Sequence, residues 1–68
     1  METVRCYVDN ERLVVEFERQ SRFVYIEGQT ENGVFHVRTE HFENHSSLSD
    51  ADRRTIRDAI SNSNIVID

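Results

Sequence analysis

Residues 26–37, IEGQTENGVFHV, decide the fold of this chain. Asn32-Gly33 separates two apolar stretches, and this dipeptide signals a β-hairpin because a type I′ turn needs positive φ at both central positions. Gly28, inside the first strand, indicates a bulge or a close approach by the helix. The turn sets a register that pairs Thr30 with Phe35, Gly28 with Val37, Glu27 with Arg38, and Ile26 with Thr39.

A second hairpin precedes this one in the chain. A turn centred on Asn10-Glu11 collects six apolar side chains on one face, as the period-two alternation of a half-buried sheet requires. The pairs on that face are Val8 with Leu13, Cys6 with Val15, and Val4 with Phe17. On the opposite face Arg5 meets Glu16, and Tyr7 meets Val14.

A helix is predicted to begin near Ser49, because Ser49-Asp50-Ala51-Asp52 combines an N-cap serine with acids in the first turn. Its apolar stripe is narrow, so the helix must lie on the sheet. The stripe comprises Ile56, Ala59 and Ile60, continued by Leu48 before the cap. Ile65-Val66-Ile67 has the pattern of a short final strand at a sheet edge. We therefore expect an α+β fold in a single domain over residues 1–68: an antiparallel β-meander of about four strands, in two hairpins, packed on one C-terminal helix.

Composition limits the classes of function. Thirteen acidic against eight basic side chains give a net charge of −5, which disfavours direct nucleic-acid binding and favours a protein partner with a basic surface. The one cysteine, Cys6, forms no intrachain disulfide and is interpreted as a small buried apolar residue. The N-terminus lacks the pattern of a signal peptide, and no apolar run reaches membrane-spanning length. A cytoplasmic location, without membrane contact, is expected.

No residue pattern points to catalysis, to a cofactor or to a metal. Structural zinc needs four convergent ligands, whereas strand alternation sends His36 and His41 to opposite faces and leaves His45 in a loop. His45, Ser46, Ser47, Ser49 and Asp50 could supply a nucleophile and a base, but neighbours in sequence do not define a triad. We therefore expect a protein that is not an enzyme.

The second hairpin carries the candidate binding surface. If Val24, Ile26, Phe35 and Val37 face the helix, aromatic side chains on the opposite face stand within a charged rim, a composition typical of interfaces. In this register Phe23 lies opposite Phe42. The predicted partner-binding residues are Phe23, Tyr25, Glu27, His36, Arg38, Glu40, Phe42 and Tyr7. Two alternatives stay open: loops that fold back over this face, or an inverted assignment of inside and outside.

The C-terminal half resembles small immunity proteins of bacterial polymorphic-toxin systems. The likeness lies in the order of elements: strands, then LSDADRRTIRDAI at 48–60, then IVID at 65–68, although the chain lacks the tryptophan and proline expected of such proteins. The resemblance implies an inhibitor that binds a toxin, such as a nuclease, and it assigns no binding residue. Two alternatives remain: an anti-defence phage protein of the anti-CRISPR type, which would block a nucleic-acid-binding effector, and a structural homodimer that pairs through Ile65–Ile67.

Overall fold

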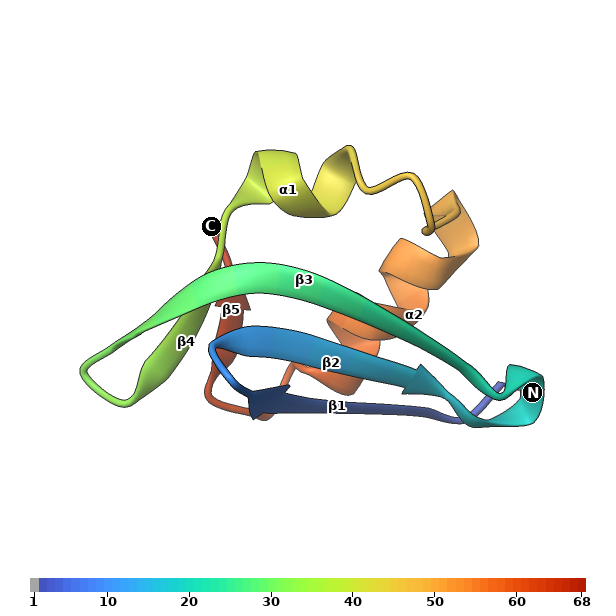
Figure 1. The fold of residues 1–68 in the computed structure, drawn as a ribbon, viewed down its shortest axis with the longest axis horizontal. Coiled ribbons are helices and arrows are strands. Elements are labelled where there is room, and N and C mark those ends of the chain that lie inside the picture. Colours follow the sequence, from blue (N-terminus) through green and yellow to red (C-terminus); the bar gives the residue numbers. More distant parts are fainter. Residues whose placement is uncertain (1) are drawn as a thin grey trace.

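The computed structural model describes residues 2–68, which form five strands, two α-helices and one 3₁₀ turn (Figure 1). The elements are β1 (Val4–Asp9), β2 (Arg12–Phe17), the 3₁₀ turn η1 (Glu18–Gln20), β3 (Arg22–Glu31), β4 (Val34–Val37), α1 (Thr39–Glu43), α2 (Asp50–Ala59) and β5 (Ile65–Ile67). The strands make one sheet in the order β1-β2-β3-β4-β5. The first four are antiparallel, and β5 runs parallel to β4 after a crossover that contains both helices. The α+β meander with its final edge strand is confirmed.

Both predicted turns have the backbone of a type I′ hairpin. Asn10 and Glu11 have φ of 56° and 60°, and Asn32 and Gly33 have φ of 53° and 80°. The first hairpin has every pair that the alternation predicts, from Val4 with Phe17 to Val8 with Leu13. The turns therefore fix the register of the sheet, and the register decides which side chains face the helices.

The second hairpin is shorter than predicted. Thr30 pairs with Phe35 and Gly28 with Val37, but the pairs Glu27–Arg38 and Ile26–Thr39 are wrong, because β4 ends at Val37 and α1 follows. β3 is long enough to pair with two strands along its length: residues 22–27 pair with β2, and residues 28–31 pair with β4.

Gly28 lies where β3 changes its pairing partner. A Cβ on Gly28 would overlap the carbonyl oxygen of His36 and would lie 2.6 Å from the ring of Phe35. The close approach inferred from Gly28 is therefore made by β4, through the backbone of His36 and the ring of Phe35, and not by the helix.

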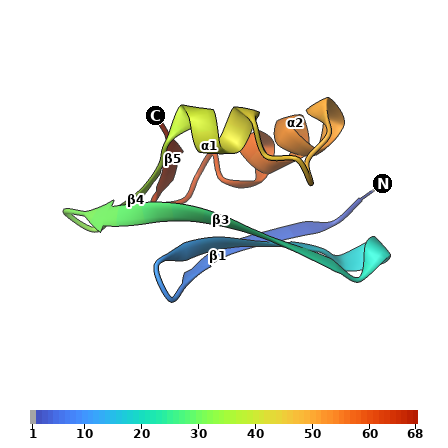
Figure 2. The ribbon, with the colours of Figure 1, turned by 45° about the horizontal axis from the view of Figure 1, so that its top comes forward.

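The hydrophobic core lies between the sheet and the two helices, which cover the same face (Figure 2). Its buried members are Leu13, Val15, Phe17, Val24, Ile26, Phe35, Val37, Phe42, Leu48, Ile56, Ile60 and Ile65. Of the stripe predicted for the helix, Ile56 in α2 and Ile60 at its C-cap are buried, whereas Ala59 is exposed, contrary to the prediction. Val24, Ile26, Phe35 and Val37 face the helices as the pattern predicts, so the other face of the sheet is the outer one.

A capping box begins α2, as the sequence around Ser49 suggests. The Ser49 hydroxyl accepts a hydrogen bond from the backbone N–H of Asp52 at 3.1 Å, and the Asp52 carboxylate accepts one from the backbone N–H of Ser49 at 3.1 Å. The same carboxylate binds Arg22 of β3 at 3.1 Å. Partial burial opposes ionisation, but the Ser49 N–H and the Arg22 guanidinium outweigh it and hold the pKa of Asp52 below its ordinary value. Asp52 thus fastens the helix to the sheet.

Asp52→Asn is expected to destabilise the fold by about 1 kcal/mol at neutral pH, since the variant keeps an acceptor for Ser49 but loses the ionic bond to Arg22. A lowered folded-state pKa contributes stability above the unfolded value of about 3.9 and loses it as the pH falls through the folded-state value. Thermal melts between pH 7 and pH 2 should therefore show the variant and the wild type converging in acid. Asp58→Asn is the control, because Asp58 makes no ion pair among residues 2–68. A constant gap between Asp52→Asn and wild type across this range would contradict the assignment.

Candidate protein-binding face

The outer face is the side of the sheet that the helices leave uncovered. The strand registers arrange its side chains in three rows that cross β1, β2 and β3. The rows are Asp9–Arg12–Glu27, Tyr7–Val14–Tyr25 and Arg5–Glu16–Phe23, and Gln29, Glu31, Val34, His36 and Val66 continue the face over β3, β4 and β5. These residues define what is called the outer face below.

The centre of the outer face is apolar. Tyr7, Phe23 and Tyr25 are 42%, 47% and 48% exposed, which is high for large hydrophobic side chains. Val14 is only 3% exposed, yet it belongs to no part of the core beneath the sheet. Its position between Tyr7 and Tyr25 in the middle row explains the burial, because the two tyrosines lie on either side of it. Tyr7 and Tyr25 thus flank a buried aliphatic centre, and Phe23 lies in the neighbouring row.

Arg12 holds one of these aromatic side chains in place. Its guanidinium lies over the ring of Tyr25, 4.4 Å from the centroid, rather than in an ion pair with Asp9 or Glu27 in its own row. Its Nε atom is buried and has no hydrogen-bond partner among the described residues. Stacking fixes both side chains, which lowers the entropy that Tyr25 would lose on contact with a partner.

Charge on the outer face is uneven. Arg5 lies 3.9 Å from Glu16 and 3.8 Å from Glu18, so the row that contains Phe23 is close to neutral. By contrast, a set of carboxylates makes no ion pair within residues 2–68: Asp9, Glu11, Glu27 and Glu31. They lie toward the two hairpin turns, which point the same way (Figure 1). These four unpaired carboxylates therefore gather at one end of the outer face.

The predicted partner-binding residues fall into three groups. Tyr7, Phe23, Tyr25 and Glu27 lie together on the outer face as predicted. His36 is further along it, where its Nδ1 lies 3.1 Å from the carboxylate of Asp68. Arg38 and Glu40 pair with each other at 2.8 Å where β4 passes into α1, and the backbone N–H of Glu40 and the charge of Arg38 lower the pKa of Glu40.

The structure corrects the prediction made for Phe42. The prediction that it points outward opposite Phe23 is wrong: it belongs to α1, is 0% exposed and packs in the core. Strand alternation continued past Val37 puts Phe42 on the outer face, whereas the helical turn directs it inward. Arg12 and Asp9 were missed, although the register of the first hairpin already paired them with each other on the face that carries Tyr7.

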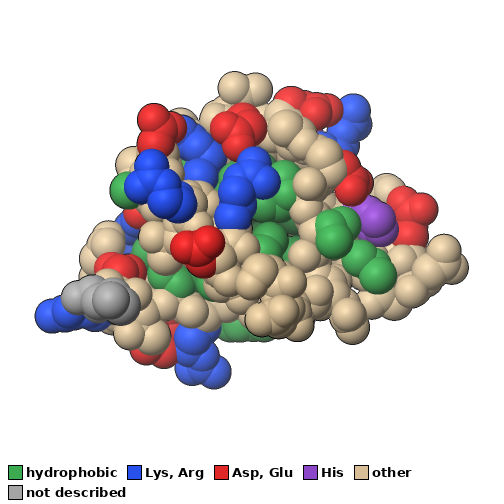
Figure 3. Space-filling model, turned by 180° about the vertical axis from the view of Figure 1, so that it is seen from behind, with side chains coloured by type: hydrophobic (Ala, Val, Ile, Leu, Met, Phe, Trp, Pro, Cys, Tyr) green, Lys and Arg blue, Asp and Glu red, His purple; other side chains and the backbone are tan. Residues whose placement is uncertain are grey.

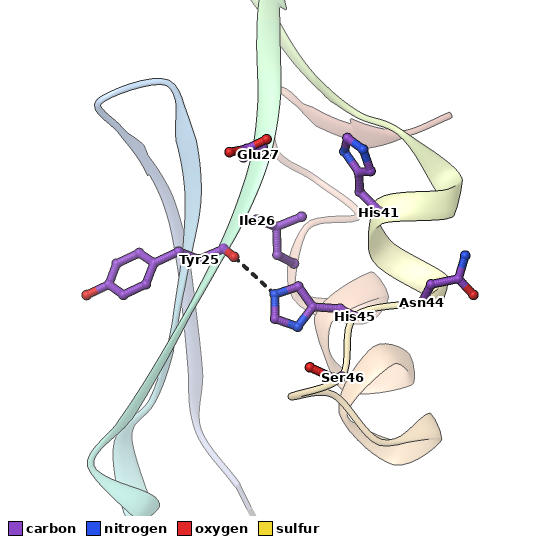
Figure 4. A pocket seen from close by; sticks show the side chains of 7 residues that line it. All are labelled: Tyr25, Ile26, Glu27, His41, Asn44, His45 and Ser46. Carbon is purple, nitrogen blue, oxygen red and sulfur yellow. Dashed lines mark hydrogen bonds between the residues drawn. The ribbon is translucent and has the colours of Figure 1, made fainter.

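An open hollow of about 420 Å³ lies beside β3, where α1 and the loop after it run along the part of the strand that β4 does not reach (Figure 4). There the His45 side chain, instead of a neighbouring strand, makes a hydrogen bond to the backbone of β3. Its Nε2 donates to the carbonyl of Tyr25 at 3.1 Å, and its Nδ1 accepts from the backbone N–H of Ser47 at 3.2 Å, which is the arrangement of a neutral imidazole. The Tyr25 side chain points away, to the other side of the sheet (Figure 4). His45 is thus tied to the backbone.

Several of the side chains considered for chemistry have structural contacts. Ser49 caps α2, and burial raises the pKa of the Cys6 thiol to about 11, which keeps it protonated at neutral pH. His36, His41 and His45 lie on β4, on α1 and in the loop after it. Within residues 2–68, no three His, Cys, Asp or Glu side chains are grouped so that they could hold a metal ion.

The side of the molecule that carries α2 differs from the outer face. Basic and acidic side chains are interspersed there (Figure 3), and several of them pair with each other. Arg53 binds Asp50 and lies 3.8 Å from Glu43, and Arg57 binds Glu43 at 2.7 Å. These ion pairs compensate much of the charge on this side of the molecule within the chain.

Comparisons with known proteins add no further constraint: no family model, no curated protein and no solved structure matches the chain significantly. Neither helix in residues 2–68 is long and apolar enough to cross a membrane.

Proposed function

We propose that this chain is a non-catalytic protein-binding module whose outer face covers a basic surface of a partner protein, as an inhibitor or an immunity-type protein does. The observation that carries the proposal is the outer face itself. Exposed Tyr7 and Tyr25 flank buried Val14, exposed Phe23 lies in the neighbouring row, and unpaired carboxylates lie at one end. Exposed aromatics of this kind are the side chains that contribute most to binding at interfaces.

The size of the molecule supports the use of one face. The described chain exposes 4613 Å², and a standard stable interface takes about 800 Å² from each partner, or roughly one sixth of this surface. In this proposal the outer face makes that contact. Its aromatic centre would provide affinity, and its carboxylates would speed association with a cationic patch.

The unpaired carboxylates favour a partner protein that normally binds nucleic acid. Asp9, Glu11, Glu27 and Glu31 present negative charge along the hairpin end, as a phosphate backbone does. A partner that normally binds nucleic acid would meet this charge with its own basic groove, whether it is a toxin nuclease or a defence effector of the kind that anti-CRISPR proteins block. A neighbouring toxin gene, or a prophage setting, would distinguish the two.

Capture from the native host tests the proposal. The full chain, immobilised through an added tag, is expected to retain one heterologous protein with a basic surface, identified by mass spectrometry. Because charge steers the contact, retention should fall as salt is raised from about 0.1 M to 1 M, where the screening length shrinks from about 10 Å to 3 Å. Recovery of further copies of this chain alone would count against the proposal.

A further inference from the structure

β1 is an edge strand with one open side (Figure 1). The type I′ turn at Asn10-Glu11 makes Asp9 and Arg12 a hydrogen-bonded pair, and at the other end Glu18 N–H donates to Thr3 C=O at 3.1 Å. In an antiparallel ladder such pairs alternate, so every odd-numbered residue of β1 bonds to β2. The N–H and C=O groups of Val4, Cys6 and Val8 consequently point to the open side.

This edge lacks several of the usual protections against strand pairing. Natural edge strands are often blunted by proline, by lysine and other charges, by a bulge or by a very short length. β1 is six residues long and reads VRCYVD, with neither proline nor lysine, and its two charged residues are of opposite sign. Tyr7 and Val8, on its two faces, are each 42% exposed. At the other edge of the sheet, β5 has only three residues, so it offers fewer backbone groups for pairing through Ile65–Ile67.

We propose that β1 pairs antiparallel with β1 of a second copy, centred on Tyr7, to form a two-fold dimer. Centring on Tyr7 places Arg5 opposite Asp9 of the second copy, twice by symmetry. It also brings Cys6 and Val8 of the second copy together as a hydrogen-bonded pair, and their exposed backbone groups point the right way to make it. Tyr7 meets its own equivalent at the non-hydrogen-bonded position, where aromatic side chains approach closely.

Charge selects this register. Asp9 has no ion-pair partner within residues 2–68. The Arg5 side chain is 64% exposed, and its contacts with Glu16 and Glu18 are long, at 3.9 Å and 3.8 Å, so it can take part in a further pair. Of the two neighbouring symmetric registers, centring on Cys6 would place Asp9 opposite Thr3 and centring on Val8 would place Asp9 opposite Tyr7, so neither gives Asp9 an opposite charge across the dimer. The proposed register compensates both Arg5 and Asp9.

The dimer joins two outer faces into one. The middle row would run from Tyr25 through Val14 and Tyr7 into Tyr7, Val14 and Tyr25 of the second copy, on a continuous sheet. This inference stands independently of the proposed function, because it rests on β1 alone. A single paired strand buries less than the ~800 Å² per partner of a standard interface, so the dimer should form and dissociate with concentration.

Sedimentation of the full chain tests the dimer. The apparent mass of the wild type should rise from the monomer value of 8.0 kDa toward twice that value as concentration increases. Arg5→Glu and Asp9→Arg each place like charges opposite one another and should weaken dimerisation at least ~10-fold. The double variant Arg5→Glu/Asp9→Arg restores the opposite-charge pairs between the two copies and, once circular dichroism shows it folded, should dimerise more tightly than either single variant. A wild type that stays monomeric up to millimolar concentration, or a double variant as weak as the singles, would overturn the proposal.

A cross-link tests the register. In a Cys6→Ala background, Tyr7→Cys places a thiol opposite its own equivalent and should give a covalent dimer under mild oxidation on a non-reducing gel. Arg5→Cys in the same background places its thiol opposite Asp9, so its cross-linking should be at least ~10-fold slower. Circular dichroism should confirm that both variants are folded. Equal rates, or faster cross-linking of Arg5→Cys, would refute pairing centred on Tyr7.

Discussion

Phe42→Ala is expected to leave the chain largely unfolded near physiological temperature. Phe42 is fully buried between α1 and the sheet, and Arg57 lies over its ring at 4.9 Å from the centroid. Replacing a buried phenylalanine by alanine lowers the free energy of unfolding by about 3–5 kcal/mol, because less apolar surface is removed from water and a cavity remains. A domain of this length has about 3–10 kcal/mol of stability, at 0.05–0.15 kcal/mol per residue. This one side chain therefore accounts for a large part of the free energy of unfolding.

Thermal denaturation followed by circular dichroism measures this effect. In a domain of this size each kcal/mol of lost stability lowers the melting midpoint by about 4–8 °C. We therefore expect the midpoint for Phe42→Ala to be at least ~12 °C lower than that of the wild type. Phe23→Ala is the matched control: the same substitution is made on the outer face, at a side chain 47% exposed, and the midpoint should move by a few degrees at most. If the two variants lost equal stability, the placement of these two rings on opposite sides of the sheet would be contradicted.

The contrast between these two phenylalanines shows where sequence patterns suffice. Both hairpins were predictable because each turn dipeptide, together with period-two alternation, leaves one register that buries the apolar residues. Val24, Ile26, Phe35 and Val37 point inward for that reason. Beyond Val37 the alternation no longer applies, because the chain leaves the sheet.

Helix α1 had no signal in the sequence. Its N-cap position is Arg38, which makes no capping bond with its side chain, and the helix has only five residues, too few to be stable alone. Burial of Phe42 against the sheet forms it, and tertiary packing of that kind cannot be read from local spacing. The final parallel pairing of β5 with β4 depends on the same crossover.

The candidate site was predictable in part, and for the same reason. Tyr7, Phe23, Tyr25 and Glu27 lie on strands whose register was known, so their common face followed from alternation. The stacking of Arg12 on Tyr25 was not predictable, since cross-strand pairing favoured an ion pair with Asp9 or Glu27 instead. Geometry in three dimensions decides which neighbour a long side chain contacts.

The replacement of Phe23 and Tyr25 together by alanine is expected to abolish most binding while the fold persists. Aromatic side chains at the centre of an interface each contribute about 2 kcal/mol or more, so the double variant should bind at least ~30-fold more weakly. The backbone carbonyl of Tyr25 still accepts the hydrogen bond from His45, so the anchoring of the loop survives the loss of the ring. The far-ultraviolet circular dichroism spectrum should be unchanged.

Isothermal titration calorimetry with the partner captured from the native host tests the central claim, that the outer face is the binding surface. Three proteins are compared: wild type, Phe23→Ala/Tyr25→Ala, and Arg54→Ala, whose exposed residue lies on α2 and makes no ion pair within residues 2–68. We predict that the double variant raises Kd at least ~30-fold and that Arg54→Ala leaves it within about twofold. An unchanged Kd for the folded double variant would contradict the claim and would place the binding surface elsewhere on the molecule.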